Sequence, residues 1–92
     1  MINKTEAILK NYALLKKAVE KVDCIQALDK ALQELSDDEY YEIIPLIYFE
    51  HRSREYIAEY FDVSVTTISR QKKRLINNLS ILLYPNDFIN AL

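Results

Sequence analysis

The stretch SREYIAEYFDVSVTTISRQKKRLINNL, residues 53–79, decides the fold of this 92-residue chain. Ser53 and Ser64 each precede a run of apolar residues at helical spacing, and a serine hydroxyl at that place accepts a backbone N–H of the first helical turn. The pattern predicts a short helix over 54–61, a turn at 62–63 and a second helix that Ser64 caps. Two helices joined by so short a turn are typical of a helix-turn-helix, whose second helix enters the major groove of DNA.

The second of these helices is expected to have two chemically different faces. Its inward stripe is predicted at Ile68, Leu75, Leu79 and Leu82, and Pro85 is expected to end the helix after Tyr84. Stepping 100° per residue from Ile68 gives a polar, basic and acid-free outward face. That face comprises Thr66, Arg70, Lys73 and Asn77, with Ser69 and Arg74 beside it.

The outward face carries the side chains that reading DNA requires. An arginine can give two parallel donors to guanine, hydroxyls can contact base edges, and lysine or arginine can neutralise phosphates. The residues expected to contact bases are Thr66, Ser69, Arg70 and Lys73. Those expected to contact phosphates are Arg52, Arg54, Ser64, Thr67, Lys72 and Arg74.

The rest of the chain is also predicted to be helical. Residues 4–35 show apolar side chains every three or four positions, which indicates a long amphipathic helix, either continuous or broken once, that packs on the core or forms a dimer seam. Ser36 and Glu39 match a capping box, which predicts a helix from Ser36 to about Glu50 with a bend at Pro45. The apolar residues of the tail, Phe88, Ile89 and Leu92, are expected to fold back onto the body.

Composition points to one all-α domain, made of a helical segment over 1–35 and a helix-turn-helix region over 36–92. Half of the residues are hydrophobic, 28% are charged, and there are two prolines and no glycine for tight hairpins. The net charge is -2, but it is unevenly spread: residues 34–50 carry six acids and no base, whereas 64–84 carry four bases and no acid. The basic end can face DNA although the whole chain is acidic.

Several function classes are disfavoured by what the sequence lacks. The single cysteine, Cys24, cannot form an internal disulfide or a metal cluster, and its expected place is the core. No apolar stretch approaches the length of a signal peptide or a membrane span, so a cytoplasmic location is expected. A phosphate-binding glycine loop and a nucleophile with its base are also lacking, so we expect no enzyme activity, cofactor or metal.

The segment from Leu35 to Leu83 resembles region 4 of bacterial sigma factors, in which an acidic helix led by leucine and serine precedes a helix-turn-helix. The residues that match the motif are Ile57, Ala58, Glu59, Tyr60, Phe61, Asp62, Val63 and Ser64, followed by Thr67 and Ile68. The run TTISRQKKRLINNLSILLY, residues 66–84, is similar to the ArpU-type regulators of phages and prophages. Asp62 stands where the motif has glycine, and Lys72 stands at a common apolar position. The resemblance implies a transcriptional regulator that binds double-stranded DNA.

Two alternatives use the same fold: a phage DNA-packaging subunit of the small-terminase kind, and a protein-interaction module without DNA binding. Besides DNA, RNA polymerase is a candidate partner, through the acidic segment 34–50. A second copy of the chain could pair through the N-terminal helix.

Overall fold

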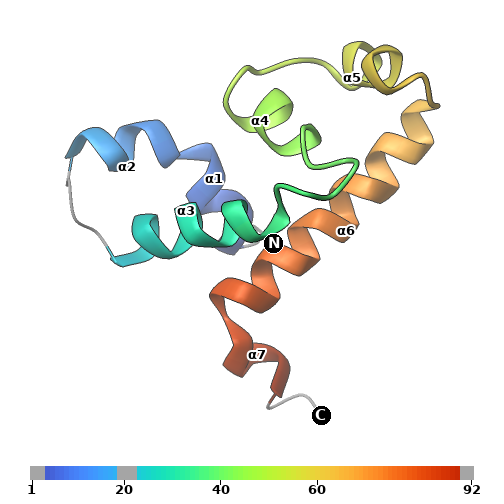
Figure 1. Ribbon diagram of the computed structural model, residues 1–92. Helices are drawn as coiled ribbons and strands as arrows, with labels where there is room; N and C mark the ends of the chain where they lie inside the picture. Colours follow the sequence, from blue (N-terminus) through green and yellow to red (C-terminus); the bar gives the residue numbers. More distant parts are fainter. Residues whose placement is uncertain (1–3, 19–22, 90–92) are drawn as a thin grey trace.

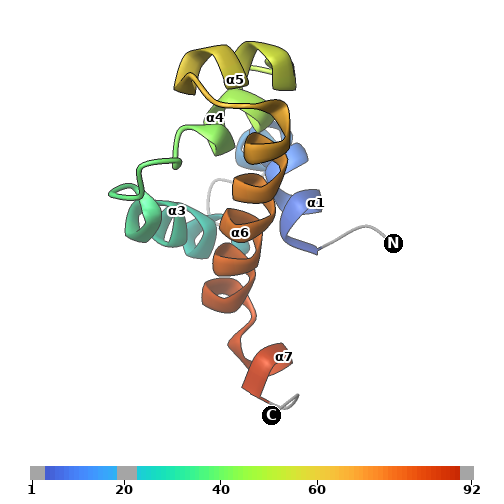
Figure 2. The same cartoon turned by 90° about the vertical axis from the view of Figure 1, so that its right-hand side faces the viewer.

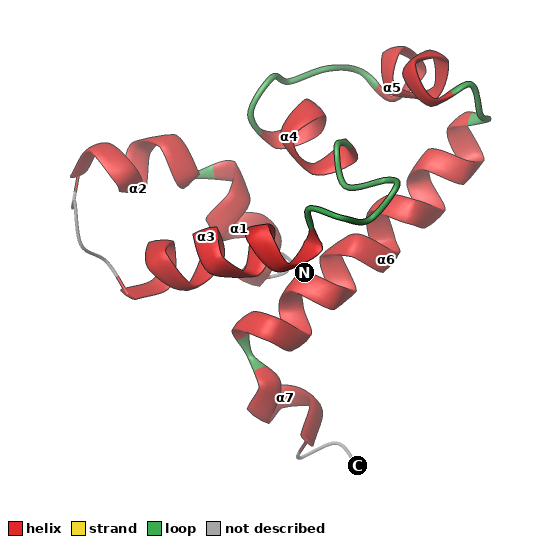
Figure 3. Cartoon of the chain, viewed as in Figure 1, coloured by secondary structure: helices red, strands yellow, loops and turns green. Residues whose placement is uncertain are grey.

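The computed structural model describes residues 4–18 and 23–89, and every regular element in those two ranges is a helix (Figures 1 and 3). The described helices are α1 Lys4–Lys10, α2 Tyr12–Ala18, α3 Asp23–Leu35, α4 Ile43–Tyr48, α5 Arg54–Phe61, α6 Val65–Leu83 and α7 Pro85–Ile89. The predicted all-α class is therefore confirmed. None of these helices is both long and apolar enough to cross a bilayer.

Helix α6 forms the centre of the fold, and α1, α3, α4, α5 and α7 all contact it. Its inner stripe is fully buried at Ile68, Leu75 and Leu79, as the spacing predicted. Leu82 was also expected inside, and this prediction is wrong because 47% of its surface is exposed. Leu83 lies closer to the inward direction than Leu82, since it is one helical turn beyond Leu79, and it packs against the core instead.

The expected long N-terminal helix is replaced by shorter ones. A straight helix over 4–35 would be about 48 Å long, whereas the longest extent of the fold is 37 Å. The first break falls at Asn11, whose side-chain Nδ2 donates to the carbonyl oxygen of Ala7 at 2.8 Å. The hydroxyl of Tyr12 then donates to Asp29 Oδ1 at 2.5 Å, which joins α2 to α3. Folding back lets both α1 and α3 bury apolar side chains against α6.

The predicted capping box at Ser36 is also wrong. Ser36 Oγ donates to the carbonyl oxygen of Gln33 at 2.7 Å, so it closes the end of α3, and residues 36–42 form successive turns. Helix α4 begins only at Ile43. Pro45 lies in its first turn, where the missing N–H removes no helical hydrogen bond, so the proline marks the start of the helix and does not bend it.

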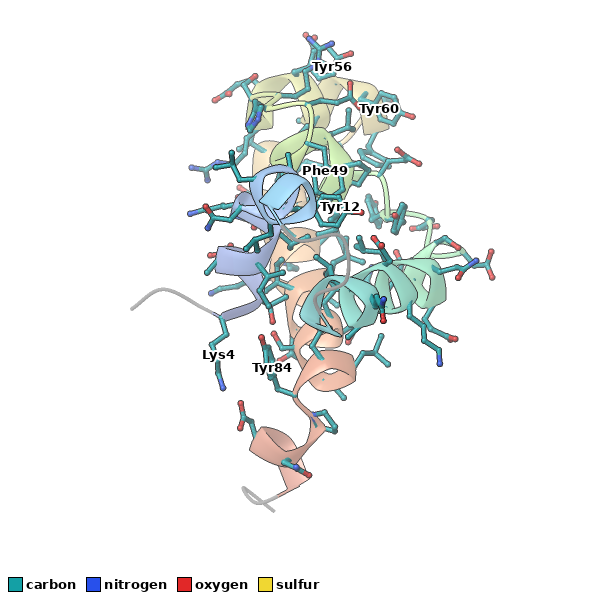
Figure 4. All side chains as sticks on the ribbon, turned by 90° about the vertical axis from the view of Figure 1, so that its left-hand side faces the viewer. Lys4, Tyr12, Phe49, Tyr56, Tyr60 and Tyr84 are labelled. Carbon is teal, nitrogen blue, oxygen red and sulfur yellow. The ribbon has the colours of Figure 1, made fainter. Side chains whose placement is uncertain are left out.

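The C-terminal end of α6 is tied back to the beginning of the chain. The helix ends at Leu83 as Pro85 predicted, but that proline opens the short helix α7. Lys4 Nζ lies 3.0 Å from Asp87 Oδ2 and 4.5 Å from the centre of the Tyr84 ring (Figure 4). Leu92 and the side chains of Cys24, Phe88 and Ile89 lie outside the described residues, so the expectations for them stay predictions.

The orientation of α6 can be tested with two leucine truncations of the same size. We expect Leu75→Ala to lower the free energy of unfolding by about 2–5 kcal/mol because it opens a cavity in the core. The matched control Leu82→Ala should change it by no more than about 0.5 kcal/mol because the side chain is half exposed. Urea unfolding of both variants measures the difference. Equal losses would contradict the burial pattern of α6.

Candidate nucleic-acid interface

The connection between α5 and α6 is built as the sequence predicted. Ser53 Oγ accepts the backbone N–H of Tyr56 at 3.1 Å, and Ser64 Oγ accepts that of Thr67, also at 3.1 Å. Between the two helices, Asp62 adopts the left-handed conformation with φ 55° and ψ 50°. Aspartate visits this region more readily than most residues, so it can stand in for the glycine that such a turn usually contains. The turn fixes the direction in which α6 leaves α5.

Small and apolar side chains hold α5 against the start of α6. Ile57 and Ala58 are the buried residues of α5, and Ile68 of α6 is fully buried. Tyr60, in contrast, is 58% exposed, and its ring makes a T-shaped contact with the ring of Phe61. Figure 4 shows Tyr60 and Tyr56 at the outer end of the molecule. The crossing therefore rests on Ile57 and Ala58, while Tyr56 and Tyr60 of α5 are exposed and Phe61 packs against the core.

A groove of about 960 Å³ runs along the outer side of α6, between the start of α5 and α1. In Figure 2, α6 runs down the front of the molecule with α1 to one side and α3 to the other. The groove brings together predicted site residues that are far apart in sequence. They are Arg52, Arg54, Ser69, Arg70, Lys72 and Lys73. The other predicted site residues, Thr66, Ser64, Thr67 and Arg74, do not line it.

Two cations at the groove make no ion pair with any described residue. Arg70 and Lys73 are exposed, and neither side chain makes an ion pair with any residue in the described ranges. Thr66 lies one turn before Arg70 and is exposed as well. The outward row of α6 thus presents a hydroxyl and two free positive charges to solvent.

The start of α5 contributes two further arginines, both of which make contacts within the protein. Arg54 Nη1 donates to Ser69 Oγ at 3.2 Å, which links the beginning of α5 to the outward face of α6. The Arg52 guanidinium lies 4.7 Å from the centre of the Tyr56 ring, and its Nε is 3.8 Å from Glu50 Oε1. These contacts restrain the two guanidinium groups beside α6.

Arg74 is engaged on the other side of α6. Its guanidinium donates to both carboxylate oxygens of Asp38, at 2.8 and 2.9 Å, and its Nε donates to Gln71 Oε1 at 2.7 Å. The hydrogen bond from Arg74 is the main cause that holds the pKa of Asp38 below its ordinary value, and the backbone N–H of Tyr40 adds to it. The pair fastens the turns of 36–42 to α6.

One acid lies among the lining residues of the groove: Glu6, from α1. Its Oε1 accepts the hydroxyl of Tyr48 at 2.7 Å and lies 3.4 Å from Lys72 Nζ. The hydrogen bond from Tyr48 is the first cause of a lowered pKa of Glu6, followed by the charge of Lys72. Burial and this carboxylate raise the pKa of Tyr48. Sequence reasoning missed the trio because its members come from three separate helices.

Cations outnumber anions among the residues that line the groove. Four of its lining residues other than Lys72 are cations, and in the part of the chain that the structure describes no three metal-binding side chains cluster. Comparison of the chain with protein-family models, curated proteins and solved structures gives no significant match. The residues and geometry of the groove are therefore the basis on which a function can be assigned.

The Asp38–Arg74 pair predicts a pH-dependent stability. Because the pKa of Asp38 is lowered in the folded state, the pair stabilises the protein above the unfolded pKa of about 3.9, and this stability is lost as the pH falls through the folded pKa. Asp38→Asn should lower the free energy of unfolding by up to about 1 kcal/mol at neutral pH, as is typical of exposed ion pairs. At a pH below the folded pKa of Asp38 the substitution should leave the free energy of unfolding unchanged. Urea unfolding at both pH values measures this.

Asp37→Asn is the matched control for that experiment. Asp37 is an exposed neighbour that makes no ion pair with a described residue, so the same loss of charge should leave stability nearly unchanged. Equal effects of the two substitutions at neutral pH would refute the role of the pair.

Proposed function

We propose that this protein binds double-stranded DNA sequence-specifically, with α6 in the major groove, and acts as a transcriptional regulator. The observation that carries the proposal is the outward row of α6, where Thr66, Arg70 and Lys73 are exposed and the two cations are free of ion pairs within the described chain. An α-helix with its side chains is about 10–12 Å wide, which fits a major groove of about 12 Å.

The two helices α5 and α6 suit a helix-turn-helix. In that motif the first helix lies across the DNA backbone while the N-terminal part of the second contacts base edges. Arg70 is assigned to a guanine, Thr66 and Ser69 to base edges, and Lys73 to a base or a nearby phosphate. The contact from Arg54 to Ser69 supports this division, because it holds a phosphate-binding candidate next to a base-reading one.

Phosphate contacts are assigned to the two ends of the interface. Arg52 and Arg54 flank α6 from the start of α5, and Ser64 with Thr67 lies at the N-terminus of α6, where exposed N–H groups and the helix dipole favour anions. The first turn of α6 has no acid to oppose a phosphate. Arg74 belongs to the Asp38 pair in our proposal, so it stabilises the fold and takes no part in the DNA contact.

The narrower assignment to a regulator of phage or prophage origin rests on the sequence. Leu35–Leu83 resembles sigma region 4, and 66–84 resembles ArpU-type regulators. The all-helical fold is compatible with both resemblances. A regulator of this kind would act from the cytoplasm, on promoter DNA.

Selection of bound sequences from random duplexes, followed by fluorescence anisotropy, tests the proposal. At the selected site, Arg70→Ala should weaken binding by about 1–3 kcal/mol and relax the preference at one base pair. Lys30→Ala, which removes an exposed cation from α3 outside the groove, is the control and should bind like the wild type.

The outcomes separate the candidate functions. Affinity that falls steeply between about 50 and 200 mM salt is expected for any DNA-binding protein because counterions are released. A selected consensus that controls a reporter supports the regulator, whereas selection without promoter activity would favour DNA packaging. Salt-independent behaviour with no enrichment would overturn DNA binding altogether.

A further inference from the structure

Lys72 differs from the other cations of the groove because a carboxylate from another helix holds it. Lys72 Nζ lies 3.4 Å from Glu6 Oε1, and the two side chains are 33% and 26% exposed. Lys72 comes from the middle of α6, whereas Glu6 comes from α1, and both line the groove. The ion pair is therefore part of the surface that our proposal gives to DNA.

Glu6 is fixed in place independently of Lys72. The hydroxyl of Tyr48, a residue that is only 5% exposed, donates to the same Oε1 at 2.7 Å. Lys72 Nζ is also 5.8 Å from the centre of the Tyr48 ring. A carboxylate with a buried hydroxyl donor and a lysine beside it stays ionised at neutral pH, in line with its lowered pKa. The negative charge is thus a permanent feature of the groove.

A fixed carboxylate in a cationic groove has two effects on a polyanion. The carboxylate pairs with the ammonium group of Lys72, so a phosphate would have to displace Glu6 before it could contact this lysine. The carboxylate also repels any phosphate that approaches the groove from the α1 side. Both effects weaken binding to every sequence alike, since neither involves a base. A loss of affinity that is equal for all sequences leaves the ratio between specific and non-specific affinity unchanged, so the carboxylate lowers the overall affinity of the groove for DNA.

We infer that Glu6 sets the overall affinity of the groove for DNA: it holds Lys72 away from phosphate and thereby limits sequence-independent binding. The inference rests on the proposed function. It differs from the sequence-based expectation for Lys72, which gave this lysine a phosphate contact. With Glu6 present, Lys72 contributes no phosphate contact; without the carboxylate it gains one.

The test measures salt dependence on a fluorescein-labelled duplex of mixed sequence by anisotropy. Glu6→Gln keeps an oxygen that can accept from Tyr48 but releases Lys72. Each added phosphate contact steepens the slope of log affinity against log salt by about 0.9, so the ratio of affinities at 50 and 200 mM salt should rise about threefold in Glu6→Gln. Glu59→Gln, the same change of charge on an exposed residue outside the groove, should keep the wild-type slope.

Substitution of Lys72 completes a double-mutant cycle with Glu6→Gln. Lys72→Gln alone should leave the wild-type slope unchanged, and the double variant Glu6→Gln/Lys72→Gln should return to that slope, because the released lysine is gone. If Glu6→Gln proves unfolded in urea titrations, the Lys72→Gln variant alone tests the inference. A slope of log affinity against log salt about 0.9 shallower than that of the wild type would mean that Lys72 already contacts phosphate in the wild type. That result overturns the inference.

The inference and the proposed function fail in different ways. A wild-type protein whose DNA binding shows no salt dependence contradicts the proposed function. A wild type with a steep slope, together with a Glu6→Gln variant of identical slope, overturns the role of Glu6 alone.

Discussion

Burial of one apolar stripe of α6 holds the remaining helices together. Ile68, Leu75 and Leu79 have no exposed surface, and helices from both ends of the chain meet on this side of α6. Burying side chains of this size is worth roughly 1.5–3 kcal/mol each, so the stripe is a major part of the stability of a small domain. The groove lies along the flank of α6 that faces α1 and the start of α5, where Arg70 and Lys73 are exposed.

The polar contacts around α6 divide its cations into those that maintain the fold and those that face solvent. Arg74 is bound by Asp38 and Lys72 by Glu6, so each fastens a different part of the chain to α6. Arg70 and Lys73 have no such partner within the described ranges. The position of each residue around the helix therefore separates structural cations from those that our proposal assigns to DNA.

Local sequence patterns predicted the α5–α6 region correctly, because helix caps and helical periodicity depend on residues that are close together in the sequence. Ser53, Asp62 and Ser64 adopt the expected roles. Longer patterns failed. Residues 4–35 could form one helix by periodicity alone, but a compact fold requires the chain to turn back. Ser36 has the sequence of a cap, yet it closes the preceding helix. The Glu6–Tyr48–Lys72 trio depends on tertiary packing and has no local signal in the sequence.

Nuclear magnetic resonance titration of the labelled protein with its selected duplex would examine the interface most directly. Our proposal predicts that backbone amide shifts move along Val65–Lys73 of α6 and at Arg52–Arg54, while the amides of α3 and of residues 36–42 stay in place. Shifts confined to α3 and the acidic turns, or no shifts at all with the selected duplex, would contradict the assignment of α6 as the DNA-reading helix.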